Sequence, residues 1–557
     1  MGIFKPSIKT IKSTSYQLLK GLGGGILILL SLSSTAVTID NLNRDLPDFS
    51  YAGYKNGAEP LAFATANTIN VADYGAKADD GNDDTKAFHK ALAAASDSDS
   101  PIVVQIPAGR FIVSDILYLE RDNLILRGAG SGATTLYFPR PLRYLPDPPE
   151  LAELRQNLKT MNKQREKSHN IDLAFSQYAW SGGFIWTRIK NERVKPYLEE
   201  YDQQPAPLAL PTQGKRGDDR LKVDNASQLR VGQIININWY NREGKDSPLL
   251  KAIYPGVAVT GSHHWNFPNR PLVSQASRIV AINNNTVIIN DVLLHDINGL
   301  TTDITQKAYL QNIGIEEFSI EFPQSAYVAH HVEQGFNGIY LTRLFDGWVK
   351  NIDIINADSG ILSEESANVS ISNVATKGDH KAHYTVAMGD THNLLAKNIT
   401  VNNTAIHPLS FNTFSTKSVY TGCEIYHAPI LDQHSGANHQ NLFDNITLHA
   451  TLDTEQLAQR RYPAFKGGGA GYWKPTHGAG SSFWNINVVF KNGLDVAKPI
   501  TLYGVDDGPN ANVIGVHGNA DIDIEYGPNA NIKMQNKAIH QAPSLYQYQL
   551  QQRLGGE

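Results

Sequence analysis

The chain has 557 residues, 41% of them hydrophobic and 18% charged, so it can bury a large core. Its formal net charge of −5 comes without a basic stretch, which argues against a nucleic-acid partner. The single cysteine, Cys423, excludes an intrachain disulfide framework, and we interpret it as a buried thiol.

The N-terminus has the three-part pattern of a secretory signal peptide. Lysines precede an apolar stretch from Gly21 to Leu32, and small residues follow up to Ala36. The apolar stretch is short for a membrane span. We therefore predict a signal peptide over residues 1–36, a linker over 37–66, and a secreted or periplasmic protein without stable membrane association. An uncleaved membrane anchor is the alternative.

The segment from Asn70 to Leu92 joins a strand and an acidic turn to an amphipathic helix. Asp84 or Thr85 would cap this helix, whose small and aromatic residues form one apolar face. The acidic turn suggests calcium, but its spacing does not match an EF-hand loop. We therefore interpret the turn as capping and turn chemistry.

This opening resembles that of pectate-lyase-like right-handed parallel β-helix proteins. The resemblance rests on Asp73-Tyr74-Gly75, Asp83-Asp84-Thr85, the stretch from Val103 to Val113 and the stretch from Leu124 to Gly130. It implies that the helix covers the open sheet edge at the N-terminal end of a solenoid. It implies a fold more than an activity, because the superfamily contains polysaccharide lyases, glycoside hydrolases, epimerases and phage tailspikes.

The strand pattern is lost between Pro139 and Asn312. Residues 219–290 contain alternating strands and a hairpin, which predict a small β-unit. We therefore predict an N-terminal cap with the first coils over residues 67–138 and a large inserted subdomain over 139–312. The insertion would either wall a groove or only stabilise the solenoid.

A short phrase of Asn followed by alternating aliphatic residues recurs further along the chain. Its first five starts are 22, 25, 24 and 23 residues apart, a period typical of a solenoid. The phrases lack a helical period and are rich in Ile, Val, Asn and Thr, which favours a β-helix over a leucine-rich horseshoe. We predict an all-β fold, a parallel β-helix over residues 313–535 with a C-terminal tail over 536–557, in which Asn side chains stack at left-handed turns. The phrases begin at Asn351, Asn373, Asn398, Gly422, Asn445 and Asn485.

Histidines are concentrated between Asp379 and His439, which contain seven of the 18 in the chain. Coils of a β-helix stack at about 4.8 Å, so residues one period apart become neighbours. The offsets within the phrases predict one patch, and three further histidines lie on longer loops. The predicted patch is Asp358, Asp379, His380, His383, His407, His427 and Asp432, and the loop residues are His392, His434 and His439.

Such a patch suits β-elimination in a uronic-acid-containing glycan. This reaction needs a base beside the carboxyl group, a cation for the carboxylate and an acid for the leaving oxygen. Histidine can act as base or acid near neutral pH. We predict His380 or His383 as base and His407 or His434 as acid. The predicted substrate-binding residues are Lys381 and Arg343 for the carboxylate, Asp379 and Asp432 to orient imidazoles, and Asp358, Asp390, His392, His427, His439 and Trp473.

Several alternatives remain open. A glycoside hydrolase would use a pair among the carboxylates of Asp358, Asp379, Asp390 and Asp432, but the motifs typical of polygalacturonases are absent. An epimerase, or a glycan-binding adhesin without activity, would use the same groove. The favoured reaction needs no cofactor, calcium is an alternative, and a transition metal is a weaker one because the histidines lack a compact zinc motif. The expected partner is an acidic polysaccharide, and the oligomeric state is open.

Overall fold

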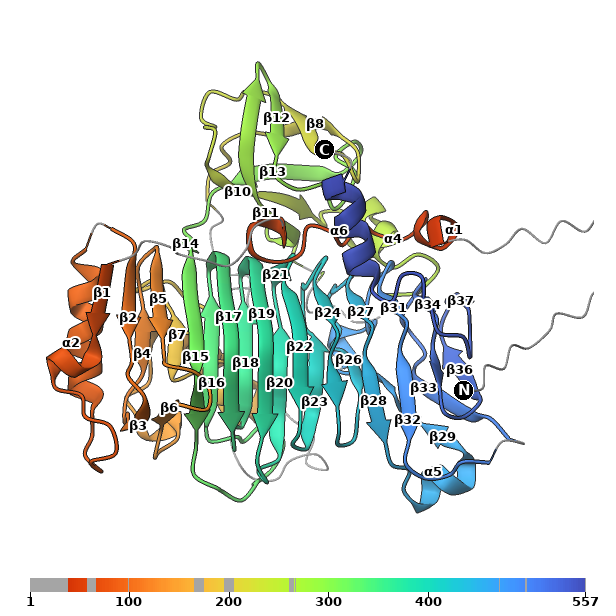
Figure 1. Ribbon diagram of the computed structural model, residues 1–557. Coiled ribbons are helices and arrows are strands. Elements are labelled where there is room, and N and C mark those ends of the chain that lie inside the picture. Colours follow the sequence, from red (N-terminus) through yellow and green to blue (C-terminus); the bar gives the residue numbers. More distant parts are fainter. Residues whose placement is uncertain are drawn as a thin grey trace, which may run out of the picture.

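A computed structural model describes residues 39–57, 67–98, 100–164, 175–194, 205–259, 265, 267–469, 471–495 and 498–555. The predicted signal peptide, residues 1–36, lies outside these residues. Within them, no helix is long and apolar enough to cross a membrane. Figure 1 shows a solenoid of stacked parallel strands with a smaller β-unit above one edge, which confirms the predicted all-β parallel β-helix.

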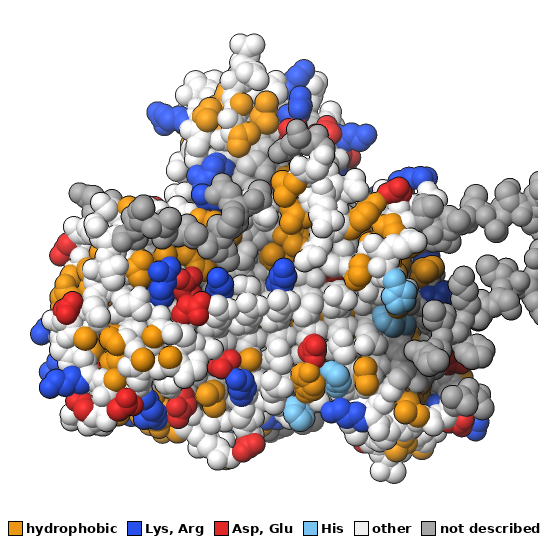
Figure 2. Space-filling model, in the orientation of Figure 1, with side chains coloured by type: hydrophobic (Ala, Val, Ile, Leu, Met, Phe, Trp, Pro, Cys, Tyr) orange, Lys and Arg blue, Asp and Glu red, His pale blue; other side chains and the backbone are white. Residues whose placement is uncertain are grey.

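Most coils contribute strands to one parallel sheet of 20 strands. On the face shown in Figure 2, acidic and basic side chains are interspersed. The strands are β1 (Asn67–Asn70), β2 (Ile102–Gln105), β3 (Gly109–Ile112), β5 (Leu124–Arg127), β6 (Thr134–Tyr137), β14 (Leu310–Gln311), β15 (Ile313–Glu321), β17 (Leu344–Ile355), β19 (Ser366–Lys377), β21 (Thr391–His392), β22 (Leu395–Val401), β24 (Val419–Thr421), β25 (Glu424–Ile425), β27 (Leu442–Asp444), β28 (Thr447–Ala450), β31 (Ser482–Trp484), β32 (Asn487–Phe490), β34 (Asn512–Ile514), β35 (His517–Gly518) and β37 (Asn531–Lys533).

A second parallel sheet of eight strands forms another side of the solenoid and positions the candidate site. A three-stranded sheet follows near the C-terminal end. The eight strands, in spatial order, are β4 (Leu117–Leu119), β7 (Ile185–Thr187), β16 (Asn337–Thr342), β18 (Ser359–Glu364), β20 (Ala382–Met388), β23 (Ala405–Phe411), β26 (Leu431–Gln433) and β30 (Phe465–Gly467). The three strands are β29 (Arg461–Tyr462), β33 (Ile500–Val505) and β36 (Ile522–Tyr526).

The Asn phrases form the predicted ladder. Asn351, Asn373 and Asn398 all have left-handed backbone, with φ of 54°, 53° and 56°. The amide of Asn373 donates to Oδ1 of Asn351 at 2.9 Å, and that of Asn398 donates to Oδ1 of Asn373 at 3.1 Å. Gly422 takes the next position with φ of 64°, and a Cβ there would lie only 2.8 Å from Oδ1 of Asn398. The aliphatic residues of each phrase point into one continuous core.

The helix α2 (Thr85–Ser96) lies at the N-terminal end of the solenoid beside β1 (Figure 1). Its predicted apolar face is buried, and the ring of Phe88 packs 5.8 Å from that of Phe111. Asp84 stabilises the preceding turn by accepting hydrogen bonds from the backbone N–H groups of Lys77 and Ile112. The remaining helices are α1 (Ile39–Asn43), α3 (Ala152–Gln164), α4 (Pro248–Ile253), α5 (Thr454–Gln459) and α6 (Leu545–Gly555).

The structure divides residues 139–312 differently from the sequence prediction. Residues 185–187 return to the solenoid as β7, because Trp186 is buried between coils and its indole N–H donates to Thr342. The predicted β-unit is a separate antiparallel sheet with its own core. Its strands are β8 (Pro211–Gly214), β9 (Arg220–Val223), β10 (Ile234–Tyr240), β11 (Pro271–Asn283), β12 (Thr286–Ile289) and β13 (Thr301–Thr305).

The predicted linker and C-terminal tail are both wrong where the structure describes them. Residues 39–57 pack with α6 along the flank of the solenoid, and Phe49 and Leu545 are both fully buried there. The backbone N–H of Phe49 donates to the side chain of Gln549 at 2.7 Å. These contacts join segments about 500 residues apart, which a local sequence pattern does not reveal.

Candidate functional site

Four imidazoles gather beside strands β20, β23 and β26 of the eight-stranded sheet, and we call them the histidine cluster. His383 lies on β20, His407 on β23, and His434 directly after β26, so neighbouring coils bring them together. His330 comes from the loop between β15 and β16, residues 322–336. Ring centroids are 4.7 Å apart for His330 and His383, 5.3 Å for His383 and His407, and 4.7 Å for His407 and His434.

Two buried carboxylates lie against the histidine cluster. Oδ2 of Asp432 is 3.1 Å from Nδ1 of His434 and 3.2 Å from Nδ1 of His407. The hydroxyl of Ser410 donates to the same oxygen. Oε1 of Glu333 lies 3.5 Å from Nδ1 of His383. Each carboxylate therefore faces the Nδ1 side of an imidazole and leaves the Nε2 side for other partners.

Burial keeps most of the cluster histidines neutral. Burial, together with neighbouring imidazoles and lysines, lowers the pKa of His330 to about 3, and burial lowers that of His407 to about 4. Burial and the same neighbours hold the pKa of His383 well below its usual range. Burial also raises the pKa of Glu333 to about 7. Burial by itself would raise the pKa of Asp432, but His407 and His434 hold that pKa well below the usual range.

Aromatic rings surround the histidine cluster. Tyr384 stacks on His383 at 4.1 Å and on His407 at 5.0 Å between centroids. Trp180 packs 4.6 Å from His331, whose ring lies 3.7 Å from that of His330. These contacts fix the orientation of the imidazoles and limit access of water to them.

His380 and Asp358 form a structural pair beside the cluster, so His380 is not free to act as the predicted base. Its Nε2 lies 2.8 Å from Oδ1 of Asp358, and its Nδ1 lies 2.8 Å from the carbonyl oxygen of Ser325. The second oxygen of Asp358 accepts hydrogen bonds from the backbone N–H groups of Gly335 and Phe336. The pair holds both ends of the loop that carries His330 and Glu333.

Other predicted residues of the patch lie at the surface. Asp379 and His427 are exposed, and no interaction among the described residues joins either to the histidine cluster. Lys381 is also exposed, and its Nζ lies 5.0 Å from the centre of the Tyr327 ring. The hydroxyl of Tyr327 donates to Glu333, so Lys381 borders the cluster and the other two do not.

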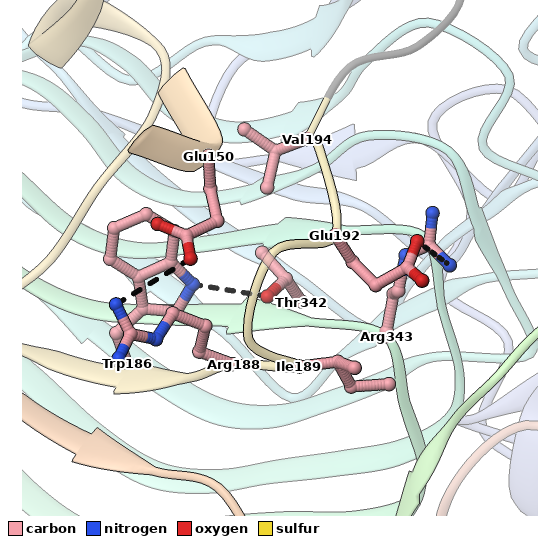
Figure 3. Close-up of a pocket in the computed structure, with 8 residues that line it drawn as sticks. All are labelled: Glu150, Trp186, Arg188, Ile189, Glu192, Val194, Thr342 and Arg343. Carbon is pink, nitrogen blue, oxygen red and sulfur yellow. Dashed lines mark hydrogen bonds and ion pairs between the residues drawn. The ribbon is translucent and has the colours of Figure 1, made fainter. Parts of the chain in front are cut away.

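Arg343 and Asp390 lie just after the C-terminal ends of β16 and β20, away from the histidine cluster. Arg343 directly follows β16, whereas His383 and His407 lie near the beginning of β20 and β23. Its Nε lies 2.8 Å from Oε2 of Glu365, and its Nη1 lies 3.2 Å from Glu192. Figure 3 shows Arg343 beside a small pocket with Glu192 turned toward it. The predicted role of Arg343 in holding the substrate carboxylate is wrong, because a buried ion pair occupies its guanidinium.

His392 and His439 lie under the inserted β-unit instead of in the cluster. Nε2 of His392 lies 2.7 Å from Asp291 of the insertion. Nε2 of His439 lies 2.8 Å from Nε2 of His295, which also belongs to the insertion. Trp473 lies near the same unit, with its ring 6.5 Å from that of Phe414. The histidines counted together in the sequence therefore do not form one patch. His383, His407 and His434 lie in the cluster, His380 lies beside it, His392 and His439 lie under the insertion, and His427 lies at the surface.

The prediction missed the loop between β15 and β16. This loop supplies His330, His331 and Glu333, and the phrase Ala329-His330-His331-Val332-Glu333 was the available signal. The Asn phrases begin only at Asn351, so they do not relate this loop to the later coils.

Two groups among the described residues have the geometry to hold a metal ion: His330, His383 and His407, and His407, Asp432 and His434. Both consist mainly of imidazoles, and the calcium alternative stays a prediction. Cys423 is fully buried, and burial raises the pKa of its thiol to about 12, which confirms the buried thiol.

Residues 68–140 match the family model described as Rhamnogalacturonase A/epimerase, pectate lyase-like. A polygalacturonase of Prunus persica is 47% identical over 73 residues, which are 13% of this chain and 19% of that relative. The chain thus matches about a fifth of the length of this curated relative. The family match contains none of the four cluster histidines.

Solved structures with a similar chain path share little sequence. A tailspike protein of Pseudomonas phage LKA1 is 13% identical with a TM-score of 0.45, over 84% of this chain and 81% of that one. A Yersinia enterocolitica family 28 exopolygalacturonase is 12% identical with a TM-score of 0.34, over 85% and 78%. The chain is a parallel β-helix protein, and its opening segment, residues 68–140, matches a pectate-lyase-like family without an identified subfamily.

Proposed function

We propose that the chain cleaves a uronic-acid-containing polysaccharide by β-elimination, with the histidine cluster as its reaction centre. The observation that carries this proposal is the pairing of Asp432 with His434. Asp432 lies 3.1 Å from Nδ1 of His434, so it favours the tautomer with the proton on Nδ1 and the lone pair on Nε2. An imidazole held in this way is a suitable general base.

Of the three cluster histidines on or beside the sheet strands, His434 is the most accessible, and it is the one of these whose Nδ1 pairs with Asp432 at 3.1 Å; His330, on the loop, is not fully buried either. The side chain of His434 is 16% exposed, compared with 2% for His407 and 0% for His383. A group that removes a proton from a polymer must reach the surface. We therefore assign the base to His434, and His383 and His407 become positioning residues around it.

The reaction balances without a redox partner. Nε2 of His434 takes the proton from the ring carbon beside the carboxylate, and that electron pair forms a carbon–carbon double bond. The bond between the adjacent carbon and the glycosidic oxygen breaks, and the leaving oxygen receives a proton. The protonated His434 is the available donor, and a positive charge near the carboxylate favours the first step.

Two lysines are placed to supply such a charge. Lys466 on β30 lies opposite Asp432 in the pairing with β26, and Lys381 borders the cluster beside Tyr327. Both positive charges contribute, after burial, to the lowered pKa of His330. An acidic glycan would bring its carboxylate toward these lysines.

A glycoside hydrolase is the second candidate. Glu333, with a pKa of about 7, and Asp432, with a lowered pKa, resemble the acid and the carboxylate that such enzymes require. However, Glu333 is 4% exposed and Asp432 is 0% exposed, and the latter faces Ser410, His407 and His434. Neither carboxylate is open to a sugar ring or a water molecule, which favours elimination.

The proposal also includes export and an acidic polysaccharide as partner. Its supports are the signal-peptide pattern in residues 1–36 and the lysines beside the cluster. An enzyme for extracellular glycans must reach its substrate outside the cell.

The test offers alginate, pectate and glucuronan to the wild-type protein and to His434→Ala, with His427→Ala as a matched exposed control. Ultraviolet absorbance reports unsaturated ends, and a reducing-end assay reports every cleaved bond. We expect wild-type and His427→Ala to give both signals on one glycan and His434→Ala to lose about 10²–10⁴-fold in rate. New reducing ends without ultraviolet absorbance would show that the protein hydrolyses the glycan and does not cleave it by elimination. Glycan binding without either signal would contradict the proposal that the protein is an enzyme.

A further inference from the structure

His407 has two buried ring nitrogens without a hydrogen-bond partner among the described residues. Its side chain is 2% exposed, and neither Nδ1 nor Nε2 makes a hydrogen bond of acceptable geometry. A buried polar group without a partner is costly, so it calls for an explanation, and a bound ion or water is one that the surroundings can be tested for. Asp432 lies 3.2 Å from Nδ1 of His407, so Nε2 is the ring nitrogen that has no nearby partner in the described part of the chain to account for its burial.

The two neighbouring imidazoles, His330 and His383, place a pair of ring nitrogens at a separation that also suits two ligands of one metal ion. Nε2 of His330 and Nε2 of His383 face each other at 3.1 Å. First-row metal ions bind imidazole nitrogen at about 2.0–2.1 Å, so two ligands at angles of about 90–110° lie about 2.9–3.4 Å apart. The observed separation falls in this range. One ring nitrogen from each of His330, His383 and His407 lies within 4.8 Å of the others.

The carboxylates behind these rings match the usual surroundings of metal-bound histidine. A ligating imidazole commonly donates its other N–H to a carboxylate, which fixes its orientation. Glu333 lies 3.5 Å from Nδ1 of His383, and Asp432 lies 3.2 Å from Nδ1 of His407. Their negative charge would offset that of a divalent cation.

We propose that His330, His383 and His407 bind one divalent first-row transition-metal ion, such as zinc. Three imidazole nitrogens favour zinc and its neighbours over calcium or magnesium, which prefer oxygen ligands. Three protein ligands leave a fourth position open, as in sites that accept an exchangeable ligand. His434 lies beside this ligand set, with its ring centroid 4.7 Å from that of His407. A role for the ion in holding the substrate carboxylate rests on the proposed function, whereas the binding itself does not.

The test uses untagged full-length protein that is stripped with a chelator and dialysed. Cobalt(II) is then titrated in, and its visible absorption reports an inner-sphere site, while elemental analysis after zinc loading and desalting gives the stoichiometry. The variants are His330→Ala in the loop and His407→Asn in the sheet. His427→Ala, an exposed histidine outside the cluster, is the matched control, and circular dichroism checks the fold of every variant.

We expect about one zinc ion per wild-type chain, intense cobalt bands, and loss of both in His330→Ala and His407→Asn. His427→Ala and His434→Ala should retain the ion. Wild-type protein that takes up no ion, or variants that bind as wild type does, would overturn the proposal. Loss of binding in His434→Ala would instead assign the ion to His407, Asp432 and His434 and overturn this ligand set. If His434→Ala retains the ion but wild type cleaves no glycan, the proposed function fails and the metal site stands.

Discussion

Replacing Asp358 should release the loop that brings His330 and Glu333 to the histidine cluster. The carboxylate of Asp358 lies 2.8 Å from Nε2 of His380 and accepts two backbone hydrogen bonds of 2.9 Å from Gly335 and Phe336. The side chains of Asp358 and His380 are 5% and 2% exposed, so water does not replace these contacts while the loop is closed. Asp358→Ala removes all three at once.

The expected cost follows from the number and kind of these bonds. Each hydrogen bond to a charged group contributes about 1.5–3 kcal/mol, and breaking a buried ion pair from one side costs about 3–5 kcal/mol. The loop can open to water without unfolding the solenoid, so we take about 3–5 kcal/mol as the loss in local opening free energy. Asp358→Asn is the matched control, because an amide oxygen can still accept from the backbone, and we expect it to cost about 1–2 kcal/mol.

The pair of Asp358 and His380 should also make the stability of the closed loop depend on pH, in a direction that follows from the pKa of His380. Burial opposes protonation of His380, but the hydrogen bonds to Asp358 and Ser325 and the charge of Asp358 raise its pKa above the usual value. The stabilisation is therefore fully present below about pH 6.5 and is lost as the pH rises through the higher folded-state pKa. Asp358→Asn should lack this dependence.

Hydrogen exchange read by mass spectrometry over residues 323–336, corrected for intrinsic rates, measures the opening directly. We expect fast exchange in Asp358→Ala, intermediate exchange in Asp358→Asn, and a wild-type protection that declines as the pH rises above 6.5. Unchanged protection in Asp358→Ala would refute a structural role for the pair and would return His380 to consideration as a base.

Two further predictions concern the insertion and the Asn ladder. Lowering the pH from 7.5 to 5 should undock the inserted β-unit, and faster proteolysis of residues 205–305 would report this. Burial lowers the pKa of His439 to about 4 and that of His295 well below its usual range. Because each histidine must stay neutral in the docked state, each disfavours docking by up to about 2 kcal/mol at pH 5. Equal cleavage at both pH values would contradict this. Asn373→Ala should destabilise the protein by about 1–2 kcal/mol through its left-handed backbone, and Asn373→Gly by less, because Gly422 takes the equivalent position naturally. Equal denaturation midpoints for the two variants would refute the backbone argument.

The repeat predicted the fold because it is a local property repeated along the chain. Asn351, Asn373 and Asn398 each need a left-handed turn, and their hydrogen bonds connect successive coils, so spacing alone reveals the stack. The flank formed by residues 39–57 and α6 has no such period. Its contacts join two segments at opposite ends of the sequence, and the pattern of neither segment predicts that it packs against the other.

The candidate site was predicted only in part for a similar reason. The offsets within the phrases correctly brought His383, His407 and Asp432 together, because these residues lie on or beside neighbouring strands of one sheet. Offsets do not show which way a loop folds, so they could not reveal that His439, predicted on a longer loop, pairs with His295 under the insertion. Nor do they show that Arg343 already faces Glu365, since an ion pair across a buried turn leaves no periodic signal.

A structure of His434→Ala with a bound acidic oligosaccharide tests the central claim most directly. The variant should be unable to cleave the glycan, so an intact chain can be observed. The proposed function predicts that a uronate ring lies over the histidine cluster, with the carbon beside its carboxylate facing the space that the His434 imidazole leaves and its carboxylate near Lys466 or Lys381. An oligosaccharide bound elsewhere on the β-helix, with the histidine cluster free of sugar, would contradict it.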